Sequence, residues 1–154
     1  MADQLYTLSG ATIAISGTVQ NSDLTQSEFE GLSFTTVSNV GSIGAYGNDT
    51  NMVTYDTLDR AVIQKQKGLT NAGDPAIELA RVDSDAGQTA LIAAGAVSSR
   101  DAYAFKITKQ DGSVDYLRGL VSGPVNQNGR NEDFDLQVFT LGLVQEPLHV
   151  DASA

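Results

Sequence analysis

The sequence contains no cysteine and no tryptophan, and its only histidine is His149. Without cysteine, the chain can form neither disulfides nor thiolate nucleophiles nor cysteine-based metal sites. A single histidine also argues against a zinc centre. We therefore expect no metal and no other cofactor, and we interpret His149 as a solvent-exposed residue in a weakly patterned tail.

Long apolar runs and an excess of basic residues are missing as well. The longest apolar run, residues 90–97, is far shorter than the roughly 20 residues that cross a bilayer. The start, Met-Ala-Asp-Gln, lacks the basic and apolar parts of a signal peptide. Asp and Glu total 19 against 9 Lys and Arg, a formal net charge of −10 that disfavours ordinary DNA binding. We expect assembly in a cytoplasm and no membrane partner.

Motifs that would indicate an enzyme are also absent. The glycines at 41, 44 and 47 do not match the dinucleotide fingerprint, and no phosphate-binding loop with Gly-Lys-Ser/Thr occurs. Asp83 and Asp85 are better explained as helix-capping residues than as an acid/base pair or a calcium site. The acidic residues around Asp133 fit a solvated strand entrance. We expect no catalytic activity.

Short alternating apolar patterns separated by turn signals are typical of a mainly β protein. The length of 154 residues predicts a single domain, residues 1–154. Asp111-Gly112 predicts a tight hairpin turn, and residues 122–132 read as a polar loop. The expected strands span residues 10–19, 32–40, 76–82, 103–108, 114–121 and 133–144.

Two helical segments are expected. Thr25 and Glu28 form a capping-box pattern before Phe29, which predicts one short helical turn. Asp83, Ser84 and Asp85 predict the start of a longer helix that runs to about Val97, with an apolar stripe around Leu91.

Residues 41–73 carry many glycines and asparagines and little core signal, apart from possible extended stretches at 52–58 and 60–68. Such a long segment in a compact domain is usually functional or disordered. We interpret it as a loop that becomes ordered on a neighbouring subunit. Residues 148–154 are expected to form a flexible tail.

Several segments, taken in order, resemble the tail tube proteins of long non-contractile phages, the lambda-like group and related gene transfer agents. They cover about residues 33–145, and their order matters more than any one motif. The first two are Val53-Thr-Tyr-Asp-Thr-Leu58 with Lys67-Gly68-Leu69, and Asn71-Ala-Gly-Asp74 leading into the strand at 76–82. The others are Asp85-Ala-Gly-Gln-Thr-Ala-Leu91 and the hairpin from Tyr103 to Gly123.

The resemblance implies a β-sandwich or partial barrel with one flanking α-helix and a long extended loop. It implies hexameric rings that stack into a hollow tube, located in the virion tail. The same fold resembles contractile-tail tubes and the tube protein of type VI secretion. The loop would then make the contacts between subunits and rings, through Gly44, Tyr46, Asn48, Tyr55, Leu58, Arg60, Lys65, Lys67 and Leu69.

In such a tube the excess of acidic residues would make the lumen negative, and a negative lumen lets DNA pass without binding it. The resemblance also implies a tape measure protein in the lumen and terminator proteins at the tail end as partners. The candidate lumen residues are Asp111, Asp115, Glu132, Asp133 and Asp135.

Two other functions are weighed against the tube. A monomeric β-sandwich module on a virion surface, binding carbohydrate or protein, would need an aromatic or polar concave face, and aromatic residues make up only 6% of the chain. A small β-barrel hydrolase or isomerase would need a convergent set of titratable groups, which the sequence does not indicate. Lys65 and Lys67 are too few for a nucleic-acid patch; they are either solvated or paired with acidic groups on an adjacent ring.

Overall fold

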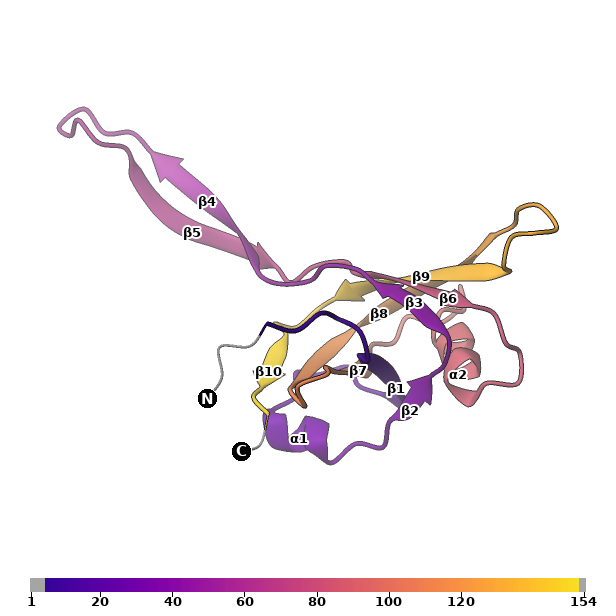
Figure 1. Cartoon of the computed structure of the whole chain (residues 1–154). Coiled ribbons are helices and arrows are strands. Elements are labelled where there is room, and N and C mark those ends of the chain that lie inside the picture. Colours follow the sequence, from indigo (N-terminus) through magenta and orange to yellow (C-terminus); the bar gives the residue numbers. More distant parts are fainter. Residues whose placement is uncertain (1–4, 153–154) are drawn as a thin grey trace.

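The computed structural model describes residues 5–152 and confirms that the fold is mainly β. One antiparallel sheet has the strand order β2-β1-β7-β8-β9-β6-β3, with β10 paired to β8, and β4 and β5 form a separate two-stranded sheet (Figure 1). The elements are β1 (Thr12–Val19), α1 (Gln26–Glu30), β2 (Thr35–Val37), β3 (Val40–Ile43), β4 (Asp49–Tyr55), β5 (Gln64–Asn71), β6 (Ala76–Ala80), α2 (Ala86–Ala94), β7 (Tyr103–Thr108), β8 (Val114–Gln127), β9 (Leu136–Leu143) and β10 (Leu148–Val150).

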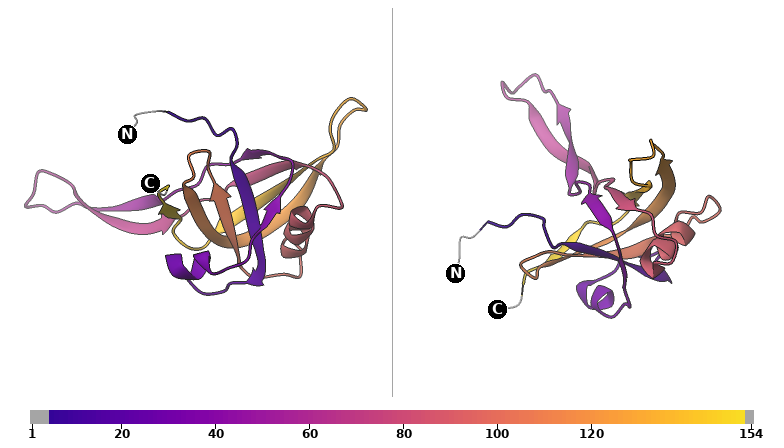
Figure 2. Two further views of the ribbon diagram at one scale, coloured as in Figure 1. Left: turned by 60° about the horizontal axis from the view of Figure 1, so that its bottom comes forward. Right: turned by 45° about the vertical axis from the view of Figure 1, so that its right-hand side comes forward.

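The large sheet curls around one hydrophobic core. Ile13 and Ile15 of β1 belong to the same buried cluster as Ile77 and Leu79 of β6, although three strands separate β1 from β6 in the sheet. Strands so far apart can share a core only if the sheet bends back on itself, which gives a partial barrel. Figure 2 shows this curvature and the position of α2 against the sheet.

A second, smaller cluster covers the other face of β7 and β8. The capping box of α1 forms as expected, with the Thr25 side chain accepting from the Glu28 amide. This short helix buries Phe29, whose ring stacks on Tyr116 at 5.1 Å between centroids. The middle of the sheet is therefore covered on both faces, which stabilises β8 as the central element.

Helix α2 begins at its expected cap but ends earlier than expected. Asp85 is the N-cap and accepts from the Gln88 amide, and Leu91 is fully buried. The helix ends at Ala94 with Gly95 as its C-cap, so the predicted extension to Val97 is wrong. Val97 lies beyond the helix and is 99% exposed. A Cβ on Gly95 would lie 2.6 Å from the Gly123 carbonyl oxygen, so the end of the helix sits directly against β8.

The hairpin of β7 and β8 forms as expected, with Gly112 at φ 92° in its turn. The polar loop expected at 122–132 is mostly strand, because β8 continues to Gln127 and pairs with β9 after a register shift between Ser122 and Val125. β9, the strand expected at 133–144, starts at Leu136, and Phe134 before it is 80% exposed. Alternation missed the extension because Gly123-Pro124, joined by a cis peptide bond, interrupts the pattern.

The prediction of a flexible tail at 148–154 is wrong for residues 148–150. These residues form β10, which pairs with β8 through Leu148 opposite Tyr116 and Val150 opposite Val114. Leu148 and Val150 also pack on the small cluster with Phe29. Two apolar side chains and a strand ladder are enough to hold this short segment, and residues 153–154 lie outside the described part.

Residues 41–73, expected as one long loop, divide into two parts. β3 and the residues up to about 48 belong to the body of the molecule, since β3 pairs with β6. Residues 49–71, here called the arm, form the hairpin of β4 and β5 that projects away from the body in every view (Figures 1 and 2). The other described residues are called the body.

Candidate assembly surfaces

The arm exposes almost every side chain that it carries. All residues of β4 and β5 are exposed except the half-buried Thr50. A hairpin that packs on its own domain buries the side chains of one face, whereas this hairpin leaves the side chains of both faces exposed. An isolated two-stranded ribbon is marginally stable in water, so the arm has the properties of an element that another surface completes.

The two faces of the arm differ chemically. The register places Met52 opposite Lys67 and Thr54 opposite Lys65, which form a basic face. It places Val53 opposite Gln66 and Tyr55 opposite Gln64, which form an amide face. Successive residues of a strand point to opposite sides, so the two lysines lie together and away from the glutamines.

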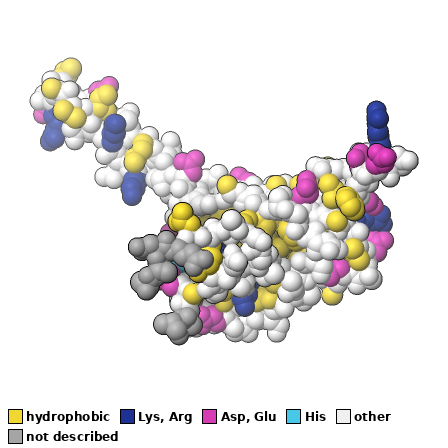
Figure 3. All heavy atoms as spheres, viewed as in Figure 1, with side chains coloured by type: hydrophobic (Ala, Val, Ile, Leu, Met, Phe, Trp, Pro, Cys, Tyr) yellow, Lys and Arg dark blue, Asp and Glu magenta, His cyan; other side chains and the backbone are white. Residues whose placement is uncertain are grey.

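Apolar side chains gather at the tip of the arm, residues 55–64. Leu58 is fully exposed, and Tyr55 and Val62 are 74% and 75% exposed. Exposed apolar clusters of this kind mark interaction sites. Figure 3 shows apolar side chains at this tip and basic side chains spaced along the arm. Val62 and Ile63 were missed in the sequence, although an apolar pair inside a polar segment is a usable signal.

The stacking residues expected from the sequence separate into two groups. Tyr55, Leu58, Arg60, Lys65, Lys67 and Leu69 all lie on the arm and are exposed. Gly44, Tyr46 and Asn48 precede the arm. A Cβ on Gly44 would lie 2.6 Å from the Ala76 nitrogen, so Gly44 is packed against β6. Asn48 donates to Glu146 at 2.9 Å. Gly44, Tyr46 and Asn48 therefore belong to the body, and their part in ring stacking stays a prediction.

Tyr46 belongs to a polar junction at the root of the arm, formed by Tyr46, Lys109, Asp115 and His149. The Tyr46 hydroxyl donates to the buried Asp115 carboxylate, His149 Nδ1 contacts the other oxygen, and Lys109 Nζ lies 3.2 Å away. The three partners come from the segment before the arm, the β7–β8 turn and β10. One carboxylate of β8 thus joins its own hairpin turn to two segments that are distant in the sequence.

The charges of the junction follow from its contacts. Burial alone would raise the pKa of Asp115, but hydrogen bonds from Tyr46, His149 and Lys109 outweigh it and hold the pKa below its ordinary value. Burial, followed by the hydrogen bond to Asp115, raises the pKa of Tyr46. The hydrogen bond to Asp115 raises the pKa of His149. His149 is solvent-exposed, as expected, but it lies in β10 and contacts Asp115, which the sequence did not indicate.

The acidic lumen residues expected from the sequence occupy several different environments. Asp115 is buried in the junction, so it cannot line a lumen as a free charge. Asp111 accepts from Ser113 and shapes the hairpin turn. Asp133 accepts from the Arg130 amide at 2.8 Å. Glu132 is exposed beside it. Asp111, Glu132 and Asp133 remain lumen predictions; Asp135 is engaged by an arginine.

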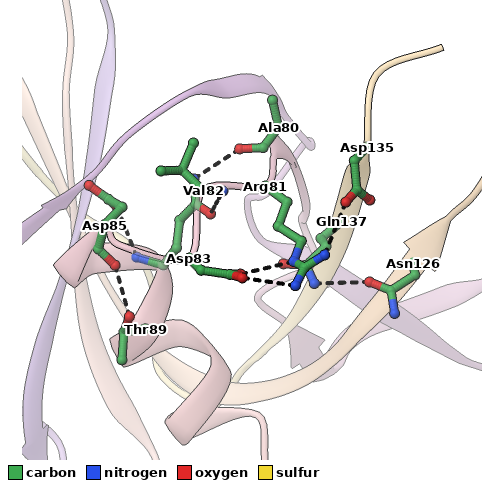
Figure 4. Close-up of polar contacts among 10 residues, drawn as sticks. Ala80, Arg81, Val82, Asp83, Asp85, Thr89, Asn126, Asp135 and Gln137 are labelled. Carbon is green, nitrogen blue, oxygen red and sulfur yellow. Dashed lines mark hydrogen bonds and ion pairs between the residues drawn. The ribbon is translucent and has the colours of Figure 1, made fainter. Parts of the chain in front are cut away.

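Arg81, the arginine that binds Asp135, forms ion pairs at the end of the sheet opposite the arm. Its guanidinium binds Asp83 at 2.9 Å and Asp135 at 3.1 Å, which joins the end of β6 to the entrance of β9 (Figure 4). Gln137 donates to Asn126 at 2.9 Å and links β9 to β8 nearby. The two contacts fix the geometry of this corner of the molecule.

A small apolar groove lies at the same corner. It is called the groove below, has a volume of 190 Å³, and is lined by Asn39, Gly41, Glu78, Leu79, Ala80, Phe134 and Leu136. Apolar side chains from β6 and β9 supply its floor, and the exposed Phe134 stands at its side. No motif in the sequence indicates this site, because its residues come from three separate segments.

The distribution of charge separates the arm from the body. The return half of the arm, residues 60–71, carries Arg60, Lys65 and Lys67 and no acidic residue. The outgoing half, residues 49–59, carries three aspartates, so the arm is neutral and the whole net charge of −10 resides in the rest of the chain. Figure 3 shows acidic side chains collected at the loop opposite the arm.

Among residues 5–152, no helix is long and apolar enough to cross a membrane. In the same residues, no group of three or more His, Cys, Asp or Glu side chains is placed to hold a metal ion.

Comparisons with known proteins show the fold. Among protein-family models and curated proteins, none matches this sequence. Solved structures do match along nearly the whole chain, at identities low enough that only the fold is shared. A sheath/tube terminator structure of the PVC extracellular contractile injection system matches with a TM-score of 0.66 and 8% identity, covering 98% of this chain and 100% of that one.

Two further structures give the same result. The baseplate structure of the anti-feeding prophage matches with a TM-score of 0.67 and 7% identity, over 100% of both chains. The PVC sheath-tube complex matches with a TM-score of 0.62 and 10% identity, covering 97% of this chain and 94% of that one. The chain therefore has a fold that is found in components of phage-tail-like injection particles.

Proposed function

We propose that this protein is a structural subunit of the tube of a phage-tail-like particle, in which copies form rings and the rings stack. The observation that carries the proposal is the arm, which exposes both faces and an apolar tip while the rest of the chain has a complete core. The match of the entire chain to components of tail-like particles supports it. The protein acts by assembly and has no catalytic role.

The finer features of the proposal come from the fold and the charge. One matched structure is described as 6-fold symmetrised, which supports hexameric rings. Two of the matched structures come from a contractile injection system, so the proposal extends from lambda-like tails to tail-like particles in general. Exposed acidic residues of the body would face a lumen through which DNA or another cargo passes without binding. A tape measure protein and tail-end proteins are the expected partners.

A terminating ring is the second candidate function, because one matched structure is a sheath/tube terminator and the match covers all of that chain. A terminator would form single rings that cap a tube, whereas a tube subunit would form long stacks. Negative-stain electron microscopy of the purified protein at increasing concentration distinguishes the two. Monomers under all conditions would contradict both and would favour the monomeric binding module.

A further inference from the structure

The arm tip and the groove lie at opposite ends of the molecule. The groove is lined by Asn39, Ala80 and Leu136, which lie at the ends of β3, β6 and β9 away from the arm. The arm leaves the body beyond Ile43, at the other end of β3, and points away from it (Figure 1). A single copy therefore cannot place its own tip in its own groove.

The groove has the size and chemistry of a receptor for a side chain. Its volume of 190 Å³ is below the ~300–1,000 Å³ of small-molecule sites. Leu79 is fully buried in its floor, and Phe134, 80% exposed, offers a free aromatic face at its edge. An aliphatic side chain such as that of Leu58 would fill the groove and cover Phe134, which is the usual form of an interface anchor.

The return half of the arm is complementary in charge to the surroundings of the groove. Residues 76–83 and 128–136, which surround the groove, carry five carboxylates and two arginines, a net charge of −3. The half of the arm that follows the tip, residues 60–71, carries +3. The tip itself, residues 55–64, carries Asp56, Asp59 and Arg60, a net charge of −1. The complementarity therefore rests on the return half of the arm, whose Arg60 and lysines of the basic face must be the side that approaches the acidic residues around the groove. Such complementarity fixes orientation and speeds association.

We infer that the tip of the arm, led by Leu58, docks into the Phe134 groove of a second copy of this chain. The contact is head-to-tail, because a surface at one end of the molecule meets a different surface at the other end. Repeated contacts of this kind close into rings or continue into filaments. The inference rests on the proposed function and specifies which surface the arm reaches.

The absence of cysteine makes a direct test possible, since any introduced thiol is the only one in the chain. Two variants, Leu58→Cys and Glu78→Cys, are mixed at an assembling concentration and treated with a short bis-maleimide. We expect a cross-linked dimer of one copy of each variant. The matched control replaces Glu78→Cys by Ser27→Cys, which places an exposed thiol on α1 away from the groove; we expect at least tenfold less dimer there.

A second variant tests the groove without a cross-linker. Phe134→Asp should keep the fold, because the side chain is exposed, and should raise the concentration needed for assembly at least tenfold. Val97→Asp, at another fully exposed apolar residue, should leave that concentration unchanged.

The outcomes separate this inference from the proposed function. Rings or tubes that form normally in Phe134→Asp, without the Leu58–Glu78 cross-link, would overturn the docking site and leave the tube proposal standing. A cross-linked pair without rings or tubes would support the docking site and contradict the tube. Cross-linking of Leu58→Cys to Ser27→Cys at equal yield would show that the tip lands elsewhere.

Discussion

Single buried polar side chains and glycines hold the segments of the body together. Gln88 is 2% exposed, yet its side chain accepts from the Val82 amide and donates to the carbonyls of Ser38 and Ala80. One amide thus satisfies three backbone groups at the junction of α2, β6 and the β2–β3 turn. Neighbouring Gly87 lets the helix approach β2 closely, because a Cβ there would lie 2.3 Å from the Thr36 carbonyl oxygen.

Gly87→Ala should destabilise the protein, although alanine is the better helix former. The added methyl group must push α2 away from backbone that cannot move freely, and overpacking of this kind costs about 1–3 kcal/mol. Urea unfolding measures the change in the free energy of unfolding. Gly17→Ala is the matched control, because a Cβ at Gly17 meets nothing within 4 Å. If both variants unfold at the same urea concentration, the close packing of α2 has been misjudged.

His149 should titrate above its ordinary pKa of about 6.5, because it contacts the Asp115 carboxylate. As the only histidine, it gives a single set of ring signals in an NMR titration. Asp115→Asn should lower the pKa of His149 towards the ordinary value. A native pKa at or below 6.5 would contradict the contact.

The same pair gives stability a defined dependence on pH. Because the folded pKa of His149 is raised, its contribution is fully present below about pH 6.5 and is lost as pH rises through the folded pKa. Asp115 has a lowered pKa, so its contribution is lost as pH falls through that pKa, below about 3.9. The hydrogen-exchange protection factors of the β10 amides, which are corrected for the intrinsic pH dependence of exchange, should therefore fall above the histidine transition, an acceleration beyond the intrinsic one. His149→Gln should remove that acceleration.

Among the elements, the arm differs most from the rest of the fold. The strands of the body each bury at least one side chain or pack on a neighbour, whereas the arm relies on its own ladder from Asp49–Asn71 to Tyr55–Gln64. Its removal therefore costs the body little buried apolar surface. We therefore expect the arm to be dispensable for folding and required for the proposed assembly.

Replacement of residues 51–69 by Asn-Gly should leave a folded and soluble body that does not assemble. Asn-Gly forms the tight turn that suits two adjacent antiparallel strands, so the pair Thr50–Thr70 can remain. We expect the free energy of unfolding to change by less than about 1 kcal/mol, because none of the removed residues is buried. Circular dichroism and electron microscopy measure the two effects. An unfolded variant would show that the arm supports the core.

The whole molecule carries a charge that opposes its own assembly. Each copy brings a net charge of −10, and such self-repulsion acts over a distance that salt shortens to about 10 Å at 0.1 M. Exposed ion pairs such as those expected from Lys65 and Lys67 contribute only about 0–1 kcal/mol each. Repulsion between bodies should therefore dominate the response to salt.

Assembly should accordingly begin at a lower protein concentration in about 0.3 M salt than in about 0.02 M salt. Light scattering across a concentration series at each ionic strength measures the threshold. Lys65→Glu with Lys67→Glu should raise the threshold at both ionic strengths. If added salt instead dissolves the assemblies, local attraction outweighs the repulsion.

The sequence predicted the parts of the fold that depend on local chemistry. The capping box at Thr25, the cap at Asp85 and the turn at Gly112 were correct, because each depends on residues within four positions. The β10 strand and the contacts of Asp115 with Tyr46 and His149 were missed, since they depend on partners 32 to 69 residues apart in the sequence.

The candidate site shows the same division. The arm was located from its lack of core residues, but its hairpin form and its two faces depend on register, which single residues do not reveal. The groove unites residues 39, 78 and 134, and no spacing rule connects them.

The free ribbon also has a kinetic consequence. In a free copy no surface is available to order the arm, whereas a copy that joins the end of an existing assembly finds that surface already in place. The first few copies to associate therefore lose the most conformational entropy for the fewest contacts. Growth should show a lag that preformed seeds abolish, and the exposed ribbon should be the first segment cut by proteases before assembly and a resistant one afterwards.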